Sequence, residues 1–139
     1  MPASTVVVDT NVFTASLKRD SGLRDLYAQQ LKGQVAGVAP QTVAEARFGA
    51  IDANWGARKM LELRALILAA DVLEVDAGLT EMVAQLRYLC KSAGHALHEP
   101  LHNGDLWIAA AAIRWGLPLV AHDGIFIGCP RLQLITELN

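Results

Sequence analysis

The chain has 139 residues, of which 53% are hydrophobic and 19% are charged. This length suits a single domain over residues 1–139, and the composition supplies enough apolar surface for a core, which argues against disorder. Twelve lysines and arginines against fourteen aspartates and glutamates give a net charge of -2. The balance excludes a broadly basic coat for nucleic acid, although it leaves room for a local basic groove.

Neither the cysteines nor the apolar runs indicate a secreted or membrane protein. Cys90 and Cys129 are too few for a disulfide scaffold. The apolar runs at 6–8 and 108–113 are much shorter than the roughly 20 residues that a membrane-spanning helix needs. No signal peptide stands out at the start of the chain. We therefore expect a soluble cytoplasmic protein that does not contact a membrane.

Short apolar runs alternate with longer helical patterns along the chain. Strands are predicted at 5–8, 35–39, 72–75, 119–121 and 132–135. Helices are predicted between them, at 22–32, 41–51, 57–69, 79–93 and 104–115. This alternation is typical of an α/β layered domain with a mostly parallel sheet. Ligands of such sheets bind beyond the carboxyl ends of the strands.

Four acidic residues are predicted near that edge of the sheet. Asp9 and Asp123 follow the first and fourth predicted strands, Asp105 begins the last predicted helix, and Glu45 lies one turn into the helix after the second strand. Crowded carboxylates repel one another, and a divalent cation relieves the repulsion. Oxygen ligands suit Mg²⁺ or Mn²⁺, which accept phosphate oxygens and activate water. The pattern predicts metal-dependent phosphoryl chemistry, most simply hydrolysis.

Each of these acids also has a purely structural interpretation. Asp9 and Asp105 are placed where a side chain caps the N-terminus of a helix. Glu45 is suited to be a solvated charge on a helix, and Asp123 followed by Gly124 is typical of a turn. Spacing and periodicity alone leave both interpretations open.

The segments around these acids resemble the motifs of a known family. Residues 7–13 (VVDTNVF), 105–110 (DLWIAA) and 118–126 (PLVAHDGIF) are similar to the opening, central and closing motifs of PIN-domain nucleases. Glu45, in the segment TVAEAR, falls where that family places a conserved glutamate. The similarity runs in order from about residue 5 to the C-terminus. In size and order the chain most closely resembles the VapC-type toxins of bacterial toxin–antitoxin pairs.

The resemblance implies an α/β PIN fold, a three-layer sandwich whose central, mainly parallel sheet carries helices on both faces. It implies a Mg²⁺- or Mn²⁺-dependent endoribonuclease that cuts structured RNA, such as tRNA or rRNA, and arrests translation. The metal-binding acids would be Asp9, Glu45, Asp105 and Asp123, supported by the polar residues Thr10 and Asn11. The implied protein partners are a cognate antitoxin and a second copy of the chain in a homodimer.

Two positions depart from the family pattern, and neither removes an acid. Ala121 stands where the family often has Thr or Ser, which takes away a hydroxyl that would help to hold Asp123. Gly104 precedes Asp105 where many relatives have Asn.

Alternatives to a nuclease remain open at this point. One is a catalytically weak PIN-like module that binds RNA or protein. Another is an aspartyl-phosphate phosphatase, although Asn11 stands where that mechanism needs a second acid. Arg47, close to Glu45 along the predicted helix, is the best candidate for a contact with an RNA phosphate. The apolar segment 60–69 suits a dimer or antitoxin groove as well as a core helix.

Overall fold

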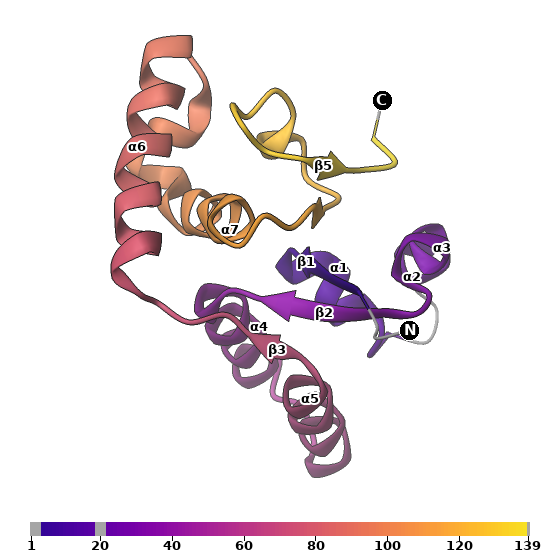
Figure 1. Ribbon diagram of the computed structural model, residues 1–139. Coiled ribbons are helices and arrows are strands. Elements are labelled where there is room, and N and C mark those ends of the chain that lie inside the picture. Colours follow the sequence, from indigo (N-terminus) through magenta and orange to yellow (C-terminus); the bar gives the residue numbers. More distant parts are fainter. Residues whose placement is uncertain (1–3, 19–21, 139) are drawn as a thin grey trace.

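A five-stranded sheet, parallel throughout, forms the centre of the protein in this computed structural model, which describes residues 4–18 and 22–138 (Figure 1). The strands are β1 (Ser4–Val8), β2 (Gln34–Val38), β3 (Asp71–Val72), β4 (Leu119–Val120) and β5 (Leu134–Ile135). Their order in the sheet is β3-β2-β1-β4-β5, and each neighbouring pair is parallel. All five strands were predicted, and the parallel sheet is confirmed.

Helices cover both faces of this sheet. They are α1 (Thr10–Ala15), α2 (Gly22–Leu26), α3 (Ala28–Leu31), α4 (Pro40–Asp52), α5 (Ala57–Ala69), α6 (Ala77–Ala93) and α7 (Asn103–Arg114), with three short 3-10 helices, η1 (Ala96–His98), η2 (Pro100–His102) and η3 (Gly124–Phe126). Residues of α6 and α7 share one core cluster, and residues of α1, α4 and α5 share another. The three-layer sandwich is thereby confirmed.

Strand β1 joins the two core clusters. Successive side chains of a strand point to opposite faces of the sheet. Val7 accordingly packs in the cluster with α6 and α7, and Val6 and Val8 pack in the cluster with α1, α4 and α5. This explains why residues 6–8 form a continuous apolar run, which is typical of a strand buried on both sides.

Small side chains hold α7 close to the sheet. The run from Ile108 to Ala112 is fully buried, and four of its five residues are alanines. These residues share a core cluster with Val7 of β1 and Leu119 of β4, so α7 packs on this face of the sheet. Among the described residues, no helix is long and apolar enough to cross a lipid bilayer.

The structure corrects two predicted elements. The segment 10–15, which no prediction covered, forms α1 immediately after Asp9. The single helix predicted at 22–32 is wrong, because the chain breaks at Tyr27 into α2 and α3. Tyr27 is fully buried, and its hydroxyl bonds to groups at residues 121–137, so a contact distant in sequence ends the first helix.

Candidate active site

Asp9 lies at the carboxyl end of β1 and is only 4% exposed. Its Oδ1 accepts a hydrogen bond of 2.9 Å from the Val12 amide, which caps α1, and its Oδ2 accepts one of 3.3 Å from the His122 amide. Burial raises the pKa of Asp9 to about 6, the two hydrogen bonds lower it, and the charges of Asp123 and Asp105 raise it again. The side chain is therefore fixed by the backbone and faces two other acids.

Asp105 and Asp123 reach the same place from other elements. Asp105 is in the first turn of α7. Its pKa is raised by burial, then by the charges of Asp123 and Glu45, and is lowered by His102, whose Nδ1 is 4.0 Å from Asp105 Oδ2. Asp123 follows β4, and its Oδ1 accepts a bond of 3.0 Å from the Ile125 amide. The neighbouring strands β1 and β4 thus end in acids that repel the acid of α7.

Glu45 completes this group from α4. Its Oε2 accepts a hydrogen bond of 2.8 Å from Thr10 Oγ1, the residue after Asp9. A Cβ added to Gly104 would lie 3.5 Å from Glu45 Oε1, so the carboxylate stands directly beside the start of α7. The four acids of the sequence analysis therefore lie along one edge of the sheet. Their role as metal ligands stays a prediction.

Two of these acids also have a structural role, which is to cap helices. Asp9 and Asp123 both cap helical segments through their own side chains. Asp105 is the third residue of α7, and no side chain caps the start of that helix within the described residues. Capping explains how two of the carboxylates are oriented, but it does not explain why three acids are gathered where they repel one another.

The remaining predicted residues have different positions. Thr10 supports Glu45 through its hydroxyl, whereas Asn11 is exposed at the start of α1 and makes no side-chain hydrogen bond within the described part of the chain. Arg47 does not share the side of Glu45. Two residues along a helix turn the side chain by about 200°, and Arg47 lines a hollow between α4 and α5.

Two further basic side chains occur in this part of the molecule. Lys18 and Glu45 both line a hollow of about 240 Å³ between α1 and α4. His102 approaches Asp105 from η2, which leads into α7. A contact of either side chain with RNA stays a prediction.

Tyr27 links the acidic edge to distant parts of the chain. Its hydroxyl lies 2.7 Å from His122 Nδ1, donates to the Ala121 carbonyl at 3.2 Å and accepts from the Glu137 amide at 2.9 Å. The backbone of His122 in turn donates to Asp9. Tyr27 thus holds the segment that follows β4 against the carboxylate of Asp9.

The donor set of this edge fits a hard divalent cation. All four acids supply carboxylate oxygens, which suit Mg²⁺ or Mn²⁺, and no cysteine lies among them. Within residues 4–18 and 22–138, no three His, Cys, Asp or Glu side chains close around a common point. Binding of an ion by these carboxylates therefore stays a prediction.

Known proteins resemble the chain in sequence pattern and in fold. The PIN domain family model matches residues 6–129. The solved VapBC2 complex of Rickettsia felis, bound to a DNA fragment from its promoter, is similar with a TM-score of 0.76 and 19% identity, covering 95% of this chain and 98% of that chain. VapBC-1 of nontypeable Haemophilus influenzae gives 0.75 and 20%, covering 95% and 97%.

A third solved structure is somewhat more similar in sequence. VapBC-5 of Mycobacterium tuberculosis, a member of the VapBC family of toxin-antitoxin systems, has a TM-score of 0.67 and 25% identity, covering 96% of this chain and 98% of that chain. No curated protein sequence matches the chain. Structural similarity at 19% and 20% identity establishes the fold alone. The match of the family model to residues 6–129 establishes membership of the family.

Proposed function

The chain belongs to the PIN domain family of nucleases, and on that premise we propose that it is the VapC-type toxin of a toxin–antitoxin pair. Its activity would be a Mg²⁺- or Mn²⁺-dependent endoribonuclease that hydrolyses structured RNA, tRNA or rRNA, and so arrests translation. One domain, residues 1–139, would carry the whole activity. The observation behind the proposal is the gathering of Asp9, Asp105 and Asp123 at one sheet edge, where burial and then the charges of neighbouring acids raise the pKa of Asp9 and Asp105.

The protein's own groups would prepare this edge for metal-dependent hydrolysis. Asp9 is fixed by two backbone amides, and Thr10 orients Glu45. Asp105 and Asp123 complete the set of carboxylate ligands. A bound Mg²⁺ or Mn²⁺ would supply the positive charge that polarises the scissile phosphate and lowers the pKa of an attacking water. Lys18, which lines the same hollow as Glu45, would neutralise a phosphate of the same RNA strand.

The energetics of Asp9 favour an active site over a catalytically weak binding module. A rise in pKa from 3.8 to about 6 disfavours the charged form in the folded protein by about 3 kcal/mol. In a module that binds no metal, this carboxylate would cap α1 at that cost, whereas a cation at this edge would remove the cost. The phosphatase alternative is also disfavoured, because Asn11 carries no carboxylate and is exposed at the start of α1.

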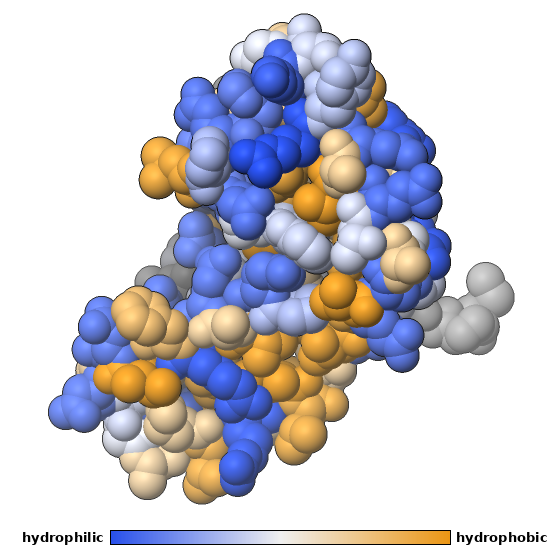
Figure 2. All heavy atoms as spheres, turned by 90° about the vertical axis from the view of Figure 1, so that its left-hand side faces the viewer, coloured by the Kyte–Doolittle hydropathy of each residue, from blue (hydrophilic) through white to orange (hydrophobic). Residues whose placement is uncertain are grey.

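The protein partners would dock on the apolar surface of α4 and α5. Phe48 is 67% exposed and Leu61 is 63% exposed, and Ile51 and Leu68 are similarly uncovered. Figure 2 shows hydrophobic residues gathered over the lower half of that face, where α5 lies in Figure 1. The hollow between α4 and α5, of about 450 Å³, would receive an apolar segment of a cognate antitoxin. A homodimer is the second proposed assembly, and light scattering of the purified protein measures it directly.

Cleavage of defined RNA tests the proposed activity. The purified protein is incubated with total tRNA and with rRNA, in Mn²⁺ and in EDTA, and the new ends are mapped. Discrete cuts are expected in Mn²⁺, and they should disappear in EDTA and in the Asp9→Asn variant. Asp25→Asn is the matched control, since it removes an exposed carboxylate on α2, away from the acidic edge, and should cut like the unmodified protein.

Two outcomes would count against the proposal. Cuts that persist in Asp9→Asn would show that cleavage does not depend on this carboxylate. Failure to cut any RNA, combined with a melting temperature that Mn²⁺ raises, would move the function to another substrate or to binding without catalysis.

A further inference from the structure

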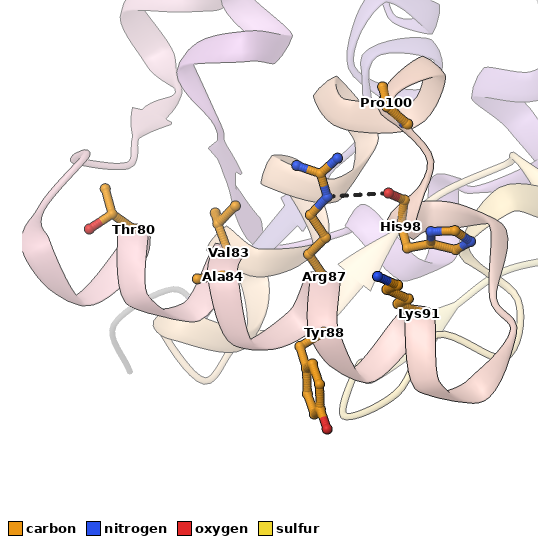
Figure 3. A pocket seen from close by; sticks show the side chains of 8 residues that line it. All are labelled: Thr80, Val83, Ala84, Arg87, Tyr88, Lys91, His98 and Pro100. Carbon is orange, nitrogen blue, oxygen red and sulfur yellow. Dashed lines mark hydrogen bonds between the residues drawn. The ribbon is translucent and has the colours of Figure 1, made fainter.

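A second hollow lies apart from the acidic edge, between α6 and the two short helices that follow it. Its volume is about 760 Å³ (Figure 3). The floor and one wall come from successive turns of α6, including Val83, Arg87 and Lys91, and the other wall is formed by His98 and Pro100. We call this hollow the α6 groove. It contains two permanent cations, and the acidic edge does not use it.

Arg87 is held in place for a ligand. Its Nε donates a hydrogen bond of 3.2 Å to the carbonyl of His98 across the groove, as the dashed line in Figure 3 shows. A guanidinium has five N–H donors, so the others remain available. Lys91 lies four residues further along α6, which places both cations on the same side of the helix. The two groups therefore present a short row of positive charge.

No acidic side chain neutralises this row within the described residues. Arg58 and Arg114 each have a carboxylate partner, whereas neither Arg87 nor Lys91 forms an ion pair in residues 4–18 and 22–138. The nearest acids in sequence are Glu81 and Glu99, and neither lines the groove. A pair of cations that lacks an acidic partner, one of them held by a backbone carbonyl, is complementary to an anion.

The groove also offers apolar and aromatic surface. Val83, Ala84 and Pro100 line it beside the cations. Tyr88 is among the lining residues and is 69% exposed, and Figure 3 shows that its ring points away from Arg87. Figure 2 shows that the upper half of this face is mainly hydrophilic, unlike the apolar surface over α5. Charge with scattered apolar contacts suits a nucleic acid strand better than an apolar protein segment.

The groove leads toward the acidic edge through η2. His98 forms one wall, and His102, four residues later, lies 4.0 Å from Asp105 Oδ2. Four residues of chain span at most about 14 Å. An RNA strand whose scissile bond lies at the acids therefore reaches the groove within a few nucleotides.

We propose that the α6 groove is a second binding site for the RNA substrate, in which Arg87 and Lys91 hold phosphodiester oxygens and Tyr88 stacks on a base. The inference rests on the proposed ribonuclease function. It adds a contact that fixes the RNA at a distance from the bond that is cut. Such a contact changes how tightly the RNA binds and leaves the chemical step at the acids unchanged.

Binding and cleavage are measured separately to test this inference. The double variant Arg87→Gln/Lys91→Gln is compared with Arg24→Gln/Lys32→Gln, which removes the same charge from exposed positions on and after the small helices α2 and α3. The probe is total tRNA, its binding measured by fluorescence polarisation in EDTA between 50 and about 300 mM salt. Each neutralised phosphate changes the salt slope of log Kd by about 0.7–0.9.

The groove variant should bind tRNA roughly 10-fold more weakly, with a salt slope reduced by about 1.5, since two phosphate contacts are lost. In Mn²⁺, its KM should rise by a similar factor while kcat stays within about 2-fold. The control should match the unmodified protein in both measurements. Tyr88→Ala should weaken binding without changing the salt slope, because stacking releases no counterions.

Three results would overturn the inference. An unchanged Kd and salt slope, in a protein that still cuts tRNA, would exclude the groove and leave the ribonuclease intact. A fall in kcat without a change in Kd would show an indirect effect on the acids. A change of molar mass in light scattering would identify the groove as a contact between copies. If the unmodified protein neither binds nor cuts RNA, the proposed function fails and this inference fails with it.

Discussion

Two aspartates of this protein have the same local structure and opposite electrostatics. Asp9 caps α1 by accepting from the Val12 amide at 2.9 Å, and Asp76 caps α6 by accepting from the Leu79 amide at 2.8 Å. Asp76 also binds Arg114, whose Nη2 lies 2.8 Å from its Oδ2, and its pKa is lowered. Asp9 is buried beside Asp105 and Asp123, and its pKa rises to about 6.

The difference lies in the charges around the two aspartates, because their capping role is the same. Both residues satisfy an amide at the start of a helix, which is the ordinary use of an aspartate there. Around Asp76 the fold supplies a counter-charge, so the carboxylate stabilises the native state. Around Asp9 it supplies more acids, which a fold without a cation to bind has no reason to keep. The same substitution at the two positions should therefore act in opposite ways.

The largest expected contrast is in RNA cleavage. Asp9→Asn should lower the cleavage rate at least about 100-fold, since loss of even an outer contact to a metal ligand typically costs 10- to 100-fold. Asp76→Asn should stay within about 2-fold of the unmodified protein. Initial rates on tRNA in Mn²⁺ measure both. Equal losses would mean that both aspartates act only through the fold.

A second contrast is in stability and its dependence on pH. The raised pKa of Asp9 means that the folded state holds this proton more tightly, so the stabilisation is complete below pH 4 and is lost as the pH rises through about 6. The metal-free protein should therefore melt at a higher temperature at pH 5 than at pH 7. Asparagine caps a helix as well as aspartate, but its single oxygen cannot also accept from the His122 amide. Asp9→Asn should therefore flatten the profile and raise the melting temperature at pH 7 by a few degrees at most.

Asp25→Asn provides the control for this profile, since it removes one carboxylate that is exposed to solvent, whereas Asp9 is buried. Its melting temperatures should follow those of the unmodified protein at each pH. Parallel curves for Asp9→Asn and the unmodified protein would contradict the assignment of the pH dependence to Asp9.

Removing the hydroxyl of Tyr27 should have a moderate effect on both properties. Tyr27→Phe removes the hydroxyl that the Glu137 amide and the His122 ring contact in partly buried hydrogen bonds, and each lost bond costs about 0.5–1.5 kcal/mol. Because the His122 backbone holds Asp9, kcat should fall several-fold while the affinity for tRNA in EDTA is unchanged. Thermal melting and single-turnover cleavage separate the two effects. A stable variant with full kcat would show that Tyr27 does not position the acids.

The smallest expected effect is at the paired aspartate. Asp76→Asn keeps the cap of α6 and removes the charge that binds Arg114, so the melting temperature should fall slightly. Salt screens an exposed pair, so the difference from the unmodified protein should shrink between 50 mM and 1 M NaCl. An equal difference at both salt concentrations would assign the loss to the cap.

The layered fold was predictable because its signals are local. Each signal is contained in one short segment. Examples are the apolar run before Asp9, the periodic pattern of α5 and the proline at 118 that precedes β4. The chain order of strands and helices then limits the topology to a parallel sheet. The four acids were placed at one edge from this topology together with their motifs, and the structure brings them there.

The contacts that orient the acids were not predictable, because they join residues far apart in the chain. Thr10 and Glu45 are 35 residues apart, and Tyr27 and His122 are 95 residues apart. Local periodicity extended one helix through Tyr27 because its ring fits an apolar face equally well, and only its hydroxyl contacts explain the break. Arg47 was chosen for its nearness to Glu45 in sequence, but the two side chains line different hollows, and its contact with RNA stays a prediction.

Because β1 is the central strand and pairs with a strand from late in the chain, the acidic edge is completed late during synthesis. β1 is made early, but its partner β4 begins more than a hundred residues later, and Tyr27 is satisfied only by groups at residues 121–137. A nascent chain therefore emerges from the ribosome with Asp9 and Glu45 but without the strand that brings Asp123 to them. If the protein cuts RNA of the translation machinery, its active site is therefore incomplete until nearly all of this sequence has been translated.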